Sequence, residues 1–255
     1  MLPASLHTLF RDSQYTRKTD WNHVALEHLT AFCNGAVSGR GFESGKQGVW
    51  LRPVFTDADG GQWCWLLLDV ESSANHDDIG LNLAAGRSFL RLLIENDLAE
   101  ALVIFLSGRG LRFCWPYLVA PEIEKAFRLW MSESEVLDTK PFNGFYRMFA
   151  NRCHKNQGVI LNRHVHRLDS IDDLWSLDEA GYLSLCGGCV DLKTSLTWLA
   201  EIAPASEIPD TWKNFLRAYQ VRTSLKDTIF SPVFPATRFK RPVRFLAEQA
   251  GFEFR

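Results

Sequence analysis

The sequence lacks the long hydrophobic run that a transmembrane helix needs. Spanning a bilayer takes roughly 20 consecutive apolar residues, and no stretch of this chain approaches that length. The first residues also lack the basic segment and the apolar core of a secretory signal. We therefore expect a cytoplasmic protein that does not associate with membranes.

Cysteine is scarce, and neither sign of charge dominates. Six cysteines scattered over 255 residues are too few for a disulfide scaffold. The formal net charge of −2 excludes a uniformly polycationic nucleic-acid binder but leaves room for a local basic patch. Low-complexity tracts and internal repeats are absent, and the composition is that of an ordinary globular protein.

The strongest functional signal is residues 63–71, an apolar run of strand type that ends in Asp69 and Glu71. Side chains alternate along a strand, so the two carboxylates point to the same side. Neighbouring carboxylates repel each other, and a chain tolerates them best when a cation lies between them. Hard oxygen ligands on a rigid backbone suit Mg²⁺ or Mn²⁺. The alternative is a strand that ends at the surface in two solvated acids.

Hydrophobic periodicity and turn residues predict the elements around this run. Gly and Asp residues at 57–61 predict a hairpin turn, and Pro121 predicts the first turn of a helix. The predicted strands cover residues 49–55, 63–71, 101–106, 111–119 (broken near Pro116) and 158–168. The predicted helices cover residues 21–34, 83–97 and 122–133, and then 171–184, 192–202, 210–219 and 242–250.

From residue 63 to residue 168 the predicted order is β-α-β-β-α-β, that of a ferredoxin-like or RRM-like unit. Such a unit has a four-stranded antiparallel sheet with two helices on one face, which leaves the other face for substrate. The fold class we expect is α+β, with an RRM-like core, N-terminal α/β additions and a C-terminal helical subdomain. The expected division is a domain of residues 1–170 and a helical part of residues 171–255.

Two cationic stretches and one more acid follow the acid pair along the chain. A Gly-rich turn with hydroxyl and guanidinium groups suits a polyphosphate, although an ordinary tight turn explains it as well. A third carboxylate would complete a two-metal site of the kind that nucleotidyl transfer requires. A solvated loop is the alternative for the second cationic stretch. The residues concerned are Ser107, Gly108, Arg109, Gly110 and Arg112 in the turn, Asp138 as the acid, and Arg147, Arg152, His154 and Lys155 in the second stretch.

The order of these motifs resembles the archaeo-eukaryotic primase superfamily, in particular the plasmid and phage primase-polymerases. Members carry a DxD or DxE pair at a strand end, an SGxGxH-type turn, a third Asp and then a basic stretch. The corresponding residues here run from Asp69-Val70-Glu71 through Ser107 to Arg112 and Asp138 to Arg147–Lys155, so the resemblance covers about residues 60–168. One departure is Arg112, which stands where the motif has His. Arginine can bind phosphate but cannot shuttle a proton.

The resemblance implies template-dependent nucleotidyl transfer, which makes or extends a primer on single-stranded DNA from nucleoside triphosphates. Asp69, Glu71 and Asp138 would hold Mg²⁺ or Mn²⁺. The cationic and Gly-rich residues would contact the nucleotide: Ser107, Gly108, Arg109, Arg112, Arg147, Arg152, His154 and Lys155. A helicase or another replication protein is the implied partner. Arg112 favours an alternative, a catalytically silent nucleic-acid-binding replication protein of the same fold. A metal-dependent nuclease is a further alternative, because the same acids can position water.

Cys186 and Cys189 have the spacing of a zinc knuckle, and either His164 and His166 or Cys153 and His154 can supply the other two ligands. Many primases of the resembled superfamily also carry a zinc site. A Gly-rich turn with two free thiols explains the same residues. Both interpretations stay open.

Overall fold

The computed structural model of the chain describes part of its 255 residues. The described residues are 7–11, 22–25, 48–51, 53–72, 74–133, 146–150, 153–154, 160–161, 163–188, 194, 197–198 and 201–219. Residues 1–216 form one compact unit, and the elements below belong to it. Residues 217–255 form a second unit, of which only 217–219 are described.

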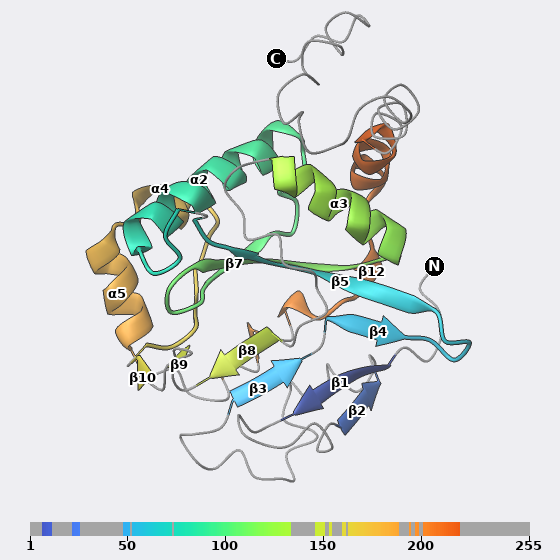
Figure 1. The fold of residues 1–255 in the computed structure, drawn as a ribbon, viewed down its shortest axis with the longest axis horizontal. Coiled ribbons are helices and arrows are strands. Elements are labelled where there is room, and N and C mark those ends of the chain that lie inside the picture. Colours follow the sequence, from blue (N-terminus) through green and yellow to red (C-terminus); the bar gives the residue numbers. More distant parts are fainter. Residues whose placement is uncertain are drawn as a thin grey trace, which may run out of the picture. The chain divides into compact units, whose positions relative to one another are not determined.

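The protein is α+β, with an antiparallel sheet and several helices (Figure 1). The strands are β1 (His7–Arg11), β2 (Asn22–Ala25), β3 (Gly48–Leu51), β4 (Val54–Thr56), β5 (Gln62–Val70), β6 (Val103–Leu106), β7 (Leu111–Val119), β8 (Tyr146–Ala150), β9 (Cys153–His154), β10 (Ile160–Leu161), β11 (His166–Arg167) and β12 (Ser206–Glu207). The helices are α2 (Ile79–Glu95), α3 (Pro121–Glu133), α4 (Asp173–Ser176) and α5 (Glu179–Gly187), and residues 210–219 are also helical. Within the described residues, no helix has the length and apolar character to cross a membrane.

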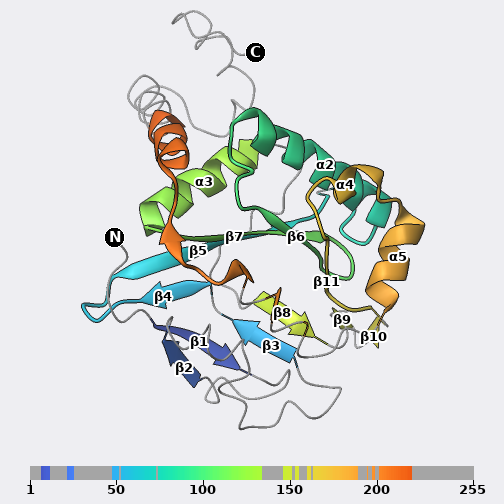
Figure 2. The same ribbon diagram turned by 180° about the vertical axis from the view of Figure 1, so that it is seen from behind.

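The sheet is built around β5 and β7, which pair antiparallel with each other. The strand order is β11-β6-β7-β5-β4-β1-β3-β8, and β2 joins β1. β6 pairs with the first half of β7, and β12 pairs in parallel with the second half. Figure 2 shows β11 beside β6 at the end of this order.

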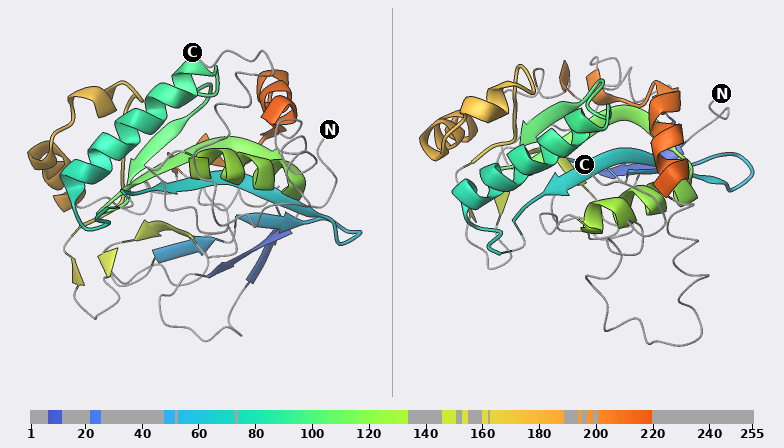
Figure 3. Two further views of the ribbon diagram at one scale, coloured as in Figure 1. Left: turned by 45° about the horizontal axis from the view of Figure 1, so that its top comes forward. Right: turned by 90° about the horizontal axis from the view of Figure 1, so that it is seen from above.

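Helices α2 and α3 cover one face of β5 and β7 (Figure 3). The ring centroids of Phe113 and Phe89 of α2 lie 5.4 Å apart, and those of Trp115 and Phe127 of α3 lie 6.1 Å apart. Gly86 lets α2 approach closely, because a Cβ there would collide with Leu111 Cδ1. Odd-numbered residues of β7 therefore face the helices, and alternation turns Arg112 to the opposite face.

Local side-chain caps fix the ends of the elements near the site. Asp78 is the N-cap of α2, and its Oδ1 accepts from the Leu81 amide at 2.9 Å. The hairpin before β5 is closed in the same way, because Asp57 Oδ1 accepts from the Gly61 amide at 2.6 Å. Gly60 in that hairpin has φ +84°, a left-handed conformation that favours glycine. The predicted turn at 57–61 is confirmed.

Strand pairing decides the outcome of two sequence expectations. The predicted helix over 21–34 is replaced at 22–25 by β2, which pairs with β1 through partners such as Thr8 and Val24; residues 26–34 lie outside the described residues. Pairing with a distant strand here overrides the helical spacing of apolar residues. The predicted break near Pro116 is present in the pairing and not in the strand: β7 runs on through Pro116, while its ladder with β5 shifts register there, opposite Trp65–Leu67.

Two predicted strands are divided in the structure. The predicted strand over 49–55 becomes β3 and β4, with Pro53, which has no amide to donate, in the gap between them. The predicted strand over 158–168 becomes β10 and β11, and residues 163–165 between them are not strand.

The order β6-β7-β5 is the one that a ferredoxin-like unit gives its second, third and first strands. On the other side of β5, β4 pairs only with Gln62–Cys64. The strand predicted as the fourth, residues 158–168, contributes β11, which pairs with β6 at the other edge and not with β5. The complete RRM-like topology stays a prediction.

Helical structure is confirmed for much of 171–184 and for 210–219, whereas 242–250 lies outside the described residues. The division into 1–170 and 171–255 stays a prediction.

Candidate functional site

The acid pair and the Gly-rich turn meet where β5 ends and β7 begins. Asp69 and Arg112 are direct cross-strand partners, and Arg112 Nε donates to Asp69 Oδ1 at 2.8 Å. The Arg112 side chain is 9% exposed and that of Asp69 is 39% exposed. A guanidinium this deeply buried requires a counter-charge, because desolvation of an unpaired ion costs several kcal/mol. Two motifs that are 43 positions apart in the sequence thus form one electrostatic unit.

The turn 107–110 packs directly against Glu71, the second acid of the pair. Its Ser107 amide donates to Gly110 O at 2.9 Å, and Gly108 adopts φ +94°. A Cβ on Gly110 would lie 2.6 Å from Glu71 Cγ and 3.0 Å from Val70 O. Glycine at this position is what allows the turn to approach Glu71.

Three carbonyl groups of this turn accept hydrogen bonds from three separate segments. Arg163 Nη1 donates to Gly108 O at 3.0 Å, and Asn82 Nδ2 donates to Arg109 O at 3.0 Å. The Tyr182 hydroxyl of α5 donates to Gly110 O at 2.7 Å. Burial raises the pKa of Tyr182 well above its usual value, so the hydroxyl keeps its proton and stays a donor. These contacts hold the turn in one conformation before any ligand arrives.

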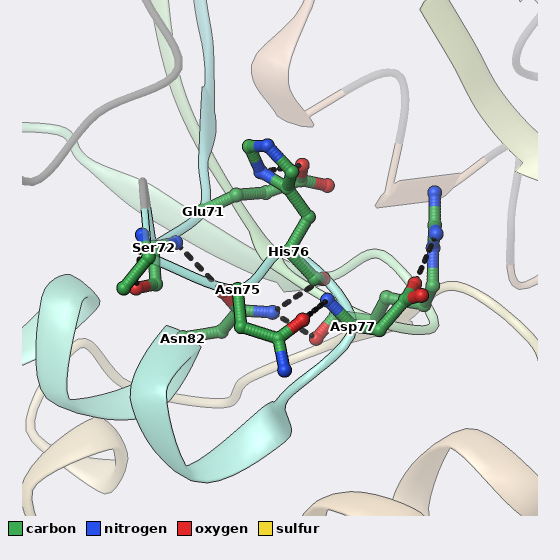
Figure 4. Close-up of polar contacts among 8 residues, drawn as sticks. Glu71, Ser72, Asn75, His76, Asp77 and Asn82 are labelled. Carbon is green, nitrogen blue, oxygen red and sulfur yellow. Dashed lines mark hydrogen bonds and ion pairs between the residues drawn. The ribbon is translucent and has the colours of Figure 1, made fainter.

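Asn82 also organises the loop that follows the acid pair (Figure 4). It is fully buried, its Oδ1 accepts from the Ser72 amide at 2.7 Å, and its Nδ2 donates to His76 O at 3.0 Å. Together with the bond to Arg109 O, one side chain joins the loop 71–78 to the turn 107–110. The distance between the acidic and the basic side of the site is therefore fixed from within α2.

The loop 71–78 also supplies a partner to Glu71 on the acidic side of the site and to Arg109 on the basic side. His76 Nδ1 lies 3.4 Å from Glu71 Oε2, and Asp77 Oδ1 accepts from Arg109 Nη1 at 2.5 Å. The Asp77 and His76 side chains are 47% and 50% exposed. Exposed pairs contribute little to stability, so a charged ligand can displace them.

The structure brings together six of the predicted site residues at this edge: Asp69, Glu71, Ser107, Gly108, Arg109 and Arg112. The backbone of Arg147 lies in β8 opposite Trp50, and that of His154 lies in β9 opposite Ile160. Asp138, Arg152 and Lys155 lie outside the described residues.

The donor chemistry of the edge suits a hard divalent ion. Asp69 and Glu71 offer carboxylate oxygens, of which Arg112 occupies Asp69 Oδ1. Within the described ranges no cluster of three or more His, Cys, Asp or Glu side chains is arranged to hold a metal ion. The predicted third ligand, Asp138, lies outside those ranges.

The predicted zinc ligands are described only in part. Cys186 is buried and its carbonyl accepts from the His164 amide at 2.6 Å, while Cys189 lies outside the described residues. Burial lowers the pKa of His166, with Asp169 acting in the opposite direction. His166 lines a cavity of about 310 Å³ between β11 and α5, together with Asp169. A zinc site stays a prediction.

Sequence reasoning missed the residues that position this site. Asn82 gives one weak signal, since asparagine is a poor helix former and here interrupts the apolar face of α2. Arg163, Tyr182, His76 and Asp77 carry no local signal, because their roles depend on contacts with residues distant in the sequence or on the path of a loop.

Comparisons of the chain with protein-family models, with curated proteins and with solved structures find no match. The function must therefore be inferred from the residues of this chain.

Proposed function

We propose that this chain is a primase-polymerase-like nucleotidyltransferase with an RRM-like core, which makes or extends a primer on single-stranded DNA. The observation that supports this most is the pairing of Asp69 with Arg112 across β5 and β7. It brings the acid pair beside the Gly-rich basic turn, in the arrangement that the order of motifs predicts. The close approach of Gly110 to Glu71 brings the same two motifs together.

In this proposal the carboxylates and the turn have separate tasks. Asp69 and Glu71, with Asp138, would hold Mg²⁺ or Mn²⁺, which would supply the Lewis acidity for activating a 3′-hydroxyl and for stabilising the leaving pyrophosphate. Arg109 leaves Asp77 and donates to phosphate oxygens of the nucleoside triphosphate, because a bidentate guanidinium–phosphate pair is stronger than an exposed ion pair. The Ser107 hydroxyl adds a donor at the start of the turn.

The second cationic stretch extends the phosphate-binding surface in this proposal. Arg147, Arg152, His154 and Lys155 neutralise the triphosphate or the template backbone. A structural zinc ion on Cys186 and Cys189, a cytoplasmic location, and a helicase or other replication protein as partner belong to the same proposal.

Primer synthesis tests the proposal directly. The full chain is incubated with single-stranded DNA, labelled NTPs or dNTPs, and Mg²⁺ or Mn²⁺. Wild-type protein is expected to give product that EDTA abolishes, and Asp69→Ala is expected to give none. Equal product from Asp69→Ala, or no product from wild type with either metal, contradicts the enzyme assignment.

One observation favours a second candidate function, a catalytically silent nucleic-acid-binding replication protein. The motif position of the imidazole is taken by Arg112, which the structure engages with Asp69. Binding of single-stranded DNA that survives EDTA, without synthesis, is the expected result for this candidate. Degradation of a labelled strand would instead identify the metal-dependent nuclease.

A further inference from the structure

A third arginine lies at the Gly-rich turn 107–110, and it comes from a distant part of the chain. Arg163 stands 55 positions after Gly108, and its Nη1 donates to Gly108 O at 3.0 Å. The residue is partly buried. The turn therefore has a guanidinium beside it that does not belong to the basic motif.

Strand pairing brings Arg163 to this turn. β11 pairs antiparallel with β6, and His166 stands opposite Leu106. In an antiparallel pair one strand runs back as the other runs forward, so the residues before His166 run beside those after Leu106, which form the turn. The next residue, His164, donates its amide to Cys186 O of α5 at 2.6 Å. The backbone at Arg163 is therefore held in place on both sides.

The arginines around the turn differ in how their charge is compensated. Arg109 is paired with Asp77, and Arg112 is paired with Asp69. Arg163, in contrast, forms no ion pair within the part of the chain that the structure describes. A neutral carbonyl takes one of its five N–H donors. A partly desolvated guanidinium without a carboxylate beside it is half of a charge pair, and an anion completes it.

The neighbouring titratable group does not supply that anion. The Tyr182 hydroxyl donates to Gly110 O of the same turn. The charge of Arg163 lowers the pKa of Tyr182, but burial raises it more, and the pKa stays well above its usual value. The hydroxyl is therefore neutral at ordinary pH, and the positive charge of Arg163 remains uncompensated.

We propose that Arg163 is a further phosphate-binding residue of the turn 107–110, which holds the triphosphate of the nucleotide together with Arg109. The role of Arg163 as a nucleotide contact rests on the proposed function, because it concerns the same nucleotide. Its Nε and Nη2 groups give a phosphate the paired, charge-assisted hydrogen bonds that guanidinium groups form with it. Arg109 must leave Asp77 before it can bind phosphate, whereas Arg163 has no described ion pair to break.

Titration of the full chain with inorganic tripolyphosphate and with dATP tests this role in EDTA, where no metal contributes. Calorimetry is expected to show binding by wild type and at least about tenfold weaker binding by Arg163→Gln, the loss of a charge-assisted contact. The salt dependence of binding should also be shallower in Arg163→Gln, because one cation fewer meets the phosphates. Arg91→Gln is the matched control, since Arg91 lies over the Trp175 ring on α2 and should bind both probes as wild type does.

Tyr182→Phe separates phosphate binding from support of the turn. It removes one hydrogen bond to the turn and no charge, so we expect slightly weaker binding with the salt dependence of wild type. Equal losses in Tyr182→Phe and Arg163→Gln, with the same salt dependence, would show that Arg163 only supports the turn, and would contradict the proposal. If Arg163→Gln does not fold, Arg163→Lys, which keeps the charge and loses the planar fork, must still bind tripolyphosphate more weakly than wild type.

The remaining outcomes distinguish this role from the proposed function. Triphosphate binding that depends on Arg163, without primer synthesis, supports the contact and contradicts the enzyme assignment. Equally tight binding by wild type and Arg163→Gln contradicts the contact alone. No binding of either probe by wild type contradicts the contact and the phosphate-binding turn together. A loss confined to a single-stranded oligonucleotide would assign Arg163 to the template backbone and would also overturn the proposal.

Discussion

Asp69 and Arg112 are unequal partners, because one reaches solvent and the other does not. When the arginine is removed, a carboxylate that is 39% exposed can recover water; when the aspartate is neutralised, a guanidinium that is 9% exposed loses its carboxylate. The cost of leaving a buried ion without its counter-charge exceeds the worth of the pair itself. This asymmetry separates a buried counter-ion from an ordinary surface ion pair.

Asp69→Asn is expected to lower the free energy of unfolding by about 1–3 kcal/mol, because it removes the Asp69 carboxylate from a guanidinium that is 9% exposed. Arg112→Gln is expected to cost less than about 1 kcal/mol, since the stranded carboxylate is partly solvated. Urea unfolding of both variants measures the difference, with Asp59→Asn in the exposed hairpin as the control. Equal costs for the two site variants would contradict the unequal burial of the pair.

Asn82 is the residue on which the connection between loop and turn depends. Asn82→Ala removes three hydrogen bonds to buried or half-buried backbone groups, and we expect a loss of about 2–4 kcal/mol in unfolding free energy. Asn75→Ala in the same loop removes one exposed contact and is the matched control. Comparable losses in the two variants would show that Asn82 does not connect the segments as described.

At the scale of elements, the sequence predicts the parts that depend on local patterns. The apolar run into Asp69 becomes the end of β5, and Pro121 opens α3 as expected. The pairing of Asp69 with Arg112 across the sheet could be anticipated only through the order of motifs, since no local pattern fixes register. The strand at 22–25 could not be predicted, because its stability comes from β1 and not from its own spacing.

The shape of the turn 107–110 affects the proposed metal site directly, because Gly110 lies against Glu71. Gly110→Ala places a methyl group against Glu71 and the Val70 carbonyl, so we expect Glu71 to shift and Mn²⁺ affinity to fall by about tenfold, with about 1–3 kcal/mol lost in stability. Gly187→Ala, where a Cβ meets nothing within 4 Å, is the control. Calorimetric Mn²⁺ titration and thermal unfolding measure both effects. Unchanged Mn²⁺ binding in Gly110→Ala would separate the turn from the metal site.

At the scale of the compact unit, segments beyond residue 170 stabilise the site as well as the core. The Tyr182 hydroxyl of α5 donates to Gly110 O of the turn. The ring centroids of Trp212, in the helical segment 210–219, and Trp115 of β7 lie 5.2 Å apart. Arg87 of α2 bonds to the carbonyls of Leu174 and Leu177 around α4. Helical periodicity predicts these segments, but it gives no information on which strand or turn they contact.

Stability is expected to fall on acidification partly through His166. Burial lowers its pKa below the ordinary value of 6.5, so the unfolded chain binds the proton more readily than the folded protein. By linkage its contribution is fully present above pH 6.5 and is lost as the pH falls through the folded pKa. His166→Gln should flatten the decline in unfolding free energy below pH 6.5, as measured by urea unfolding at several pH values. A decline as steep as that of wild type would assign the effect to other groups.

A crystal structure of the full chain with Mn²⁺ and a non-hydrolysable nucleoside triphosphate tests the central claim most directly. We expect an anomalous Mn²⁺ peak among the carboxylates of Asp69, Glu71 and Asp138. We also expect the triphosphate over the turn 107–110, with Arg109 moved from Asp77 onto a phosphate. A nucleotide bound elsewhere, or Asp138 beyond reach of the other two acids with no Mn²⁺ peak among them, would contradict the account.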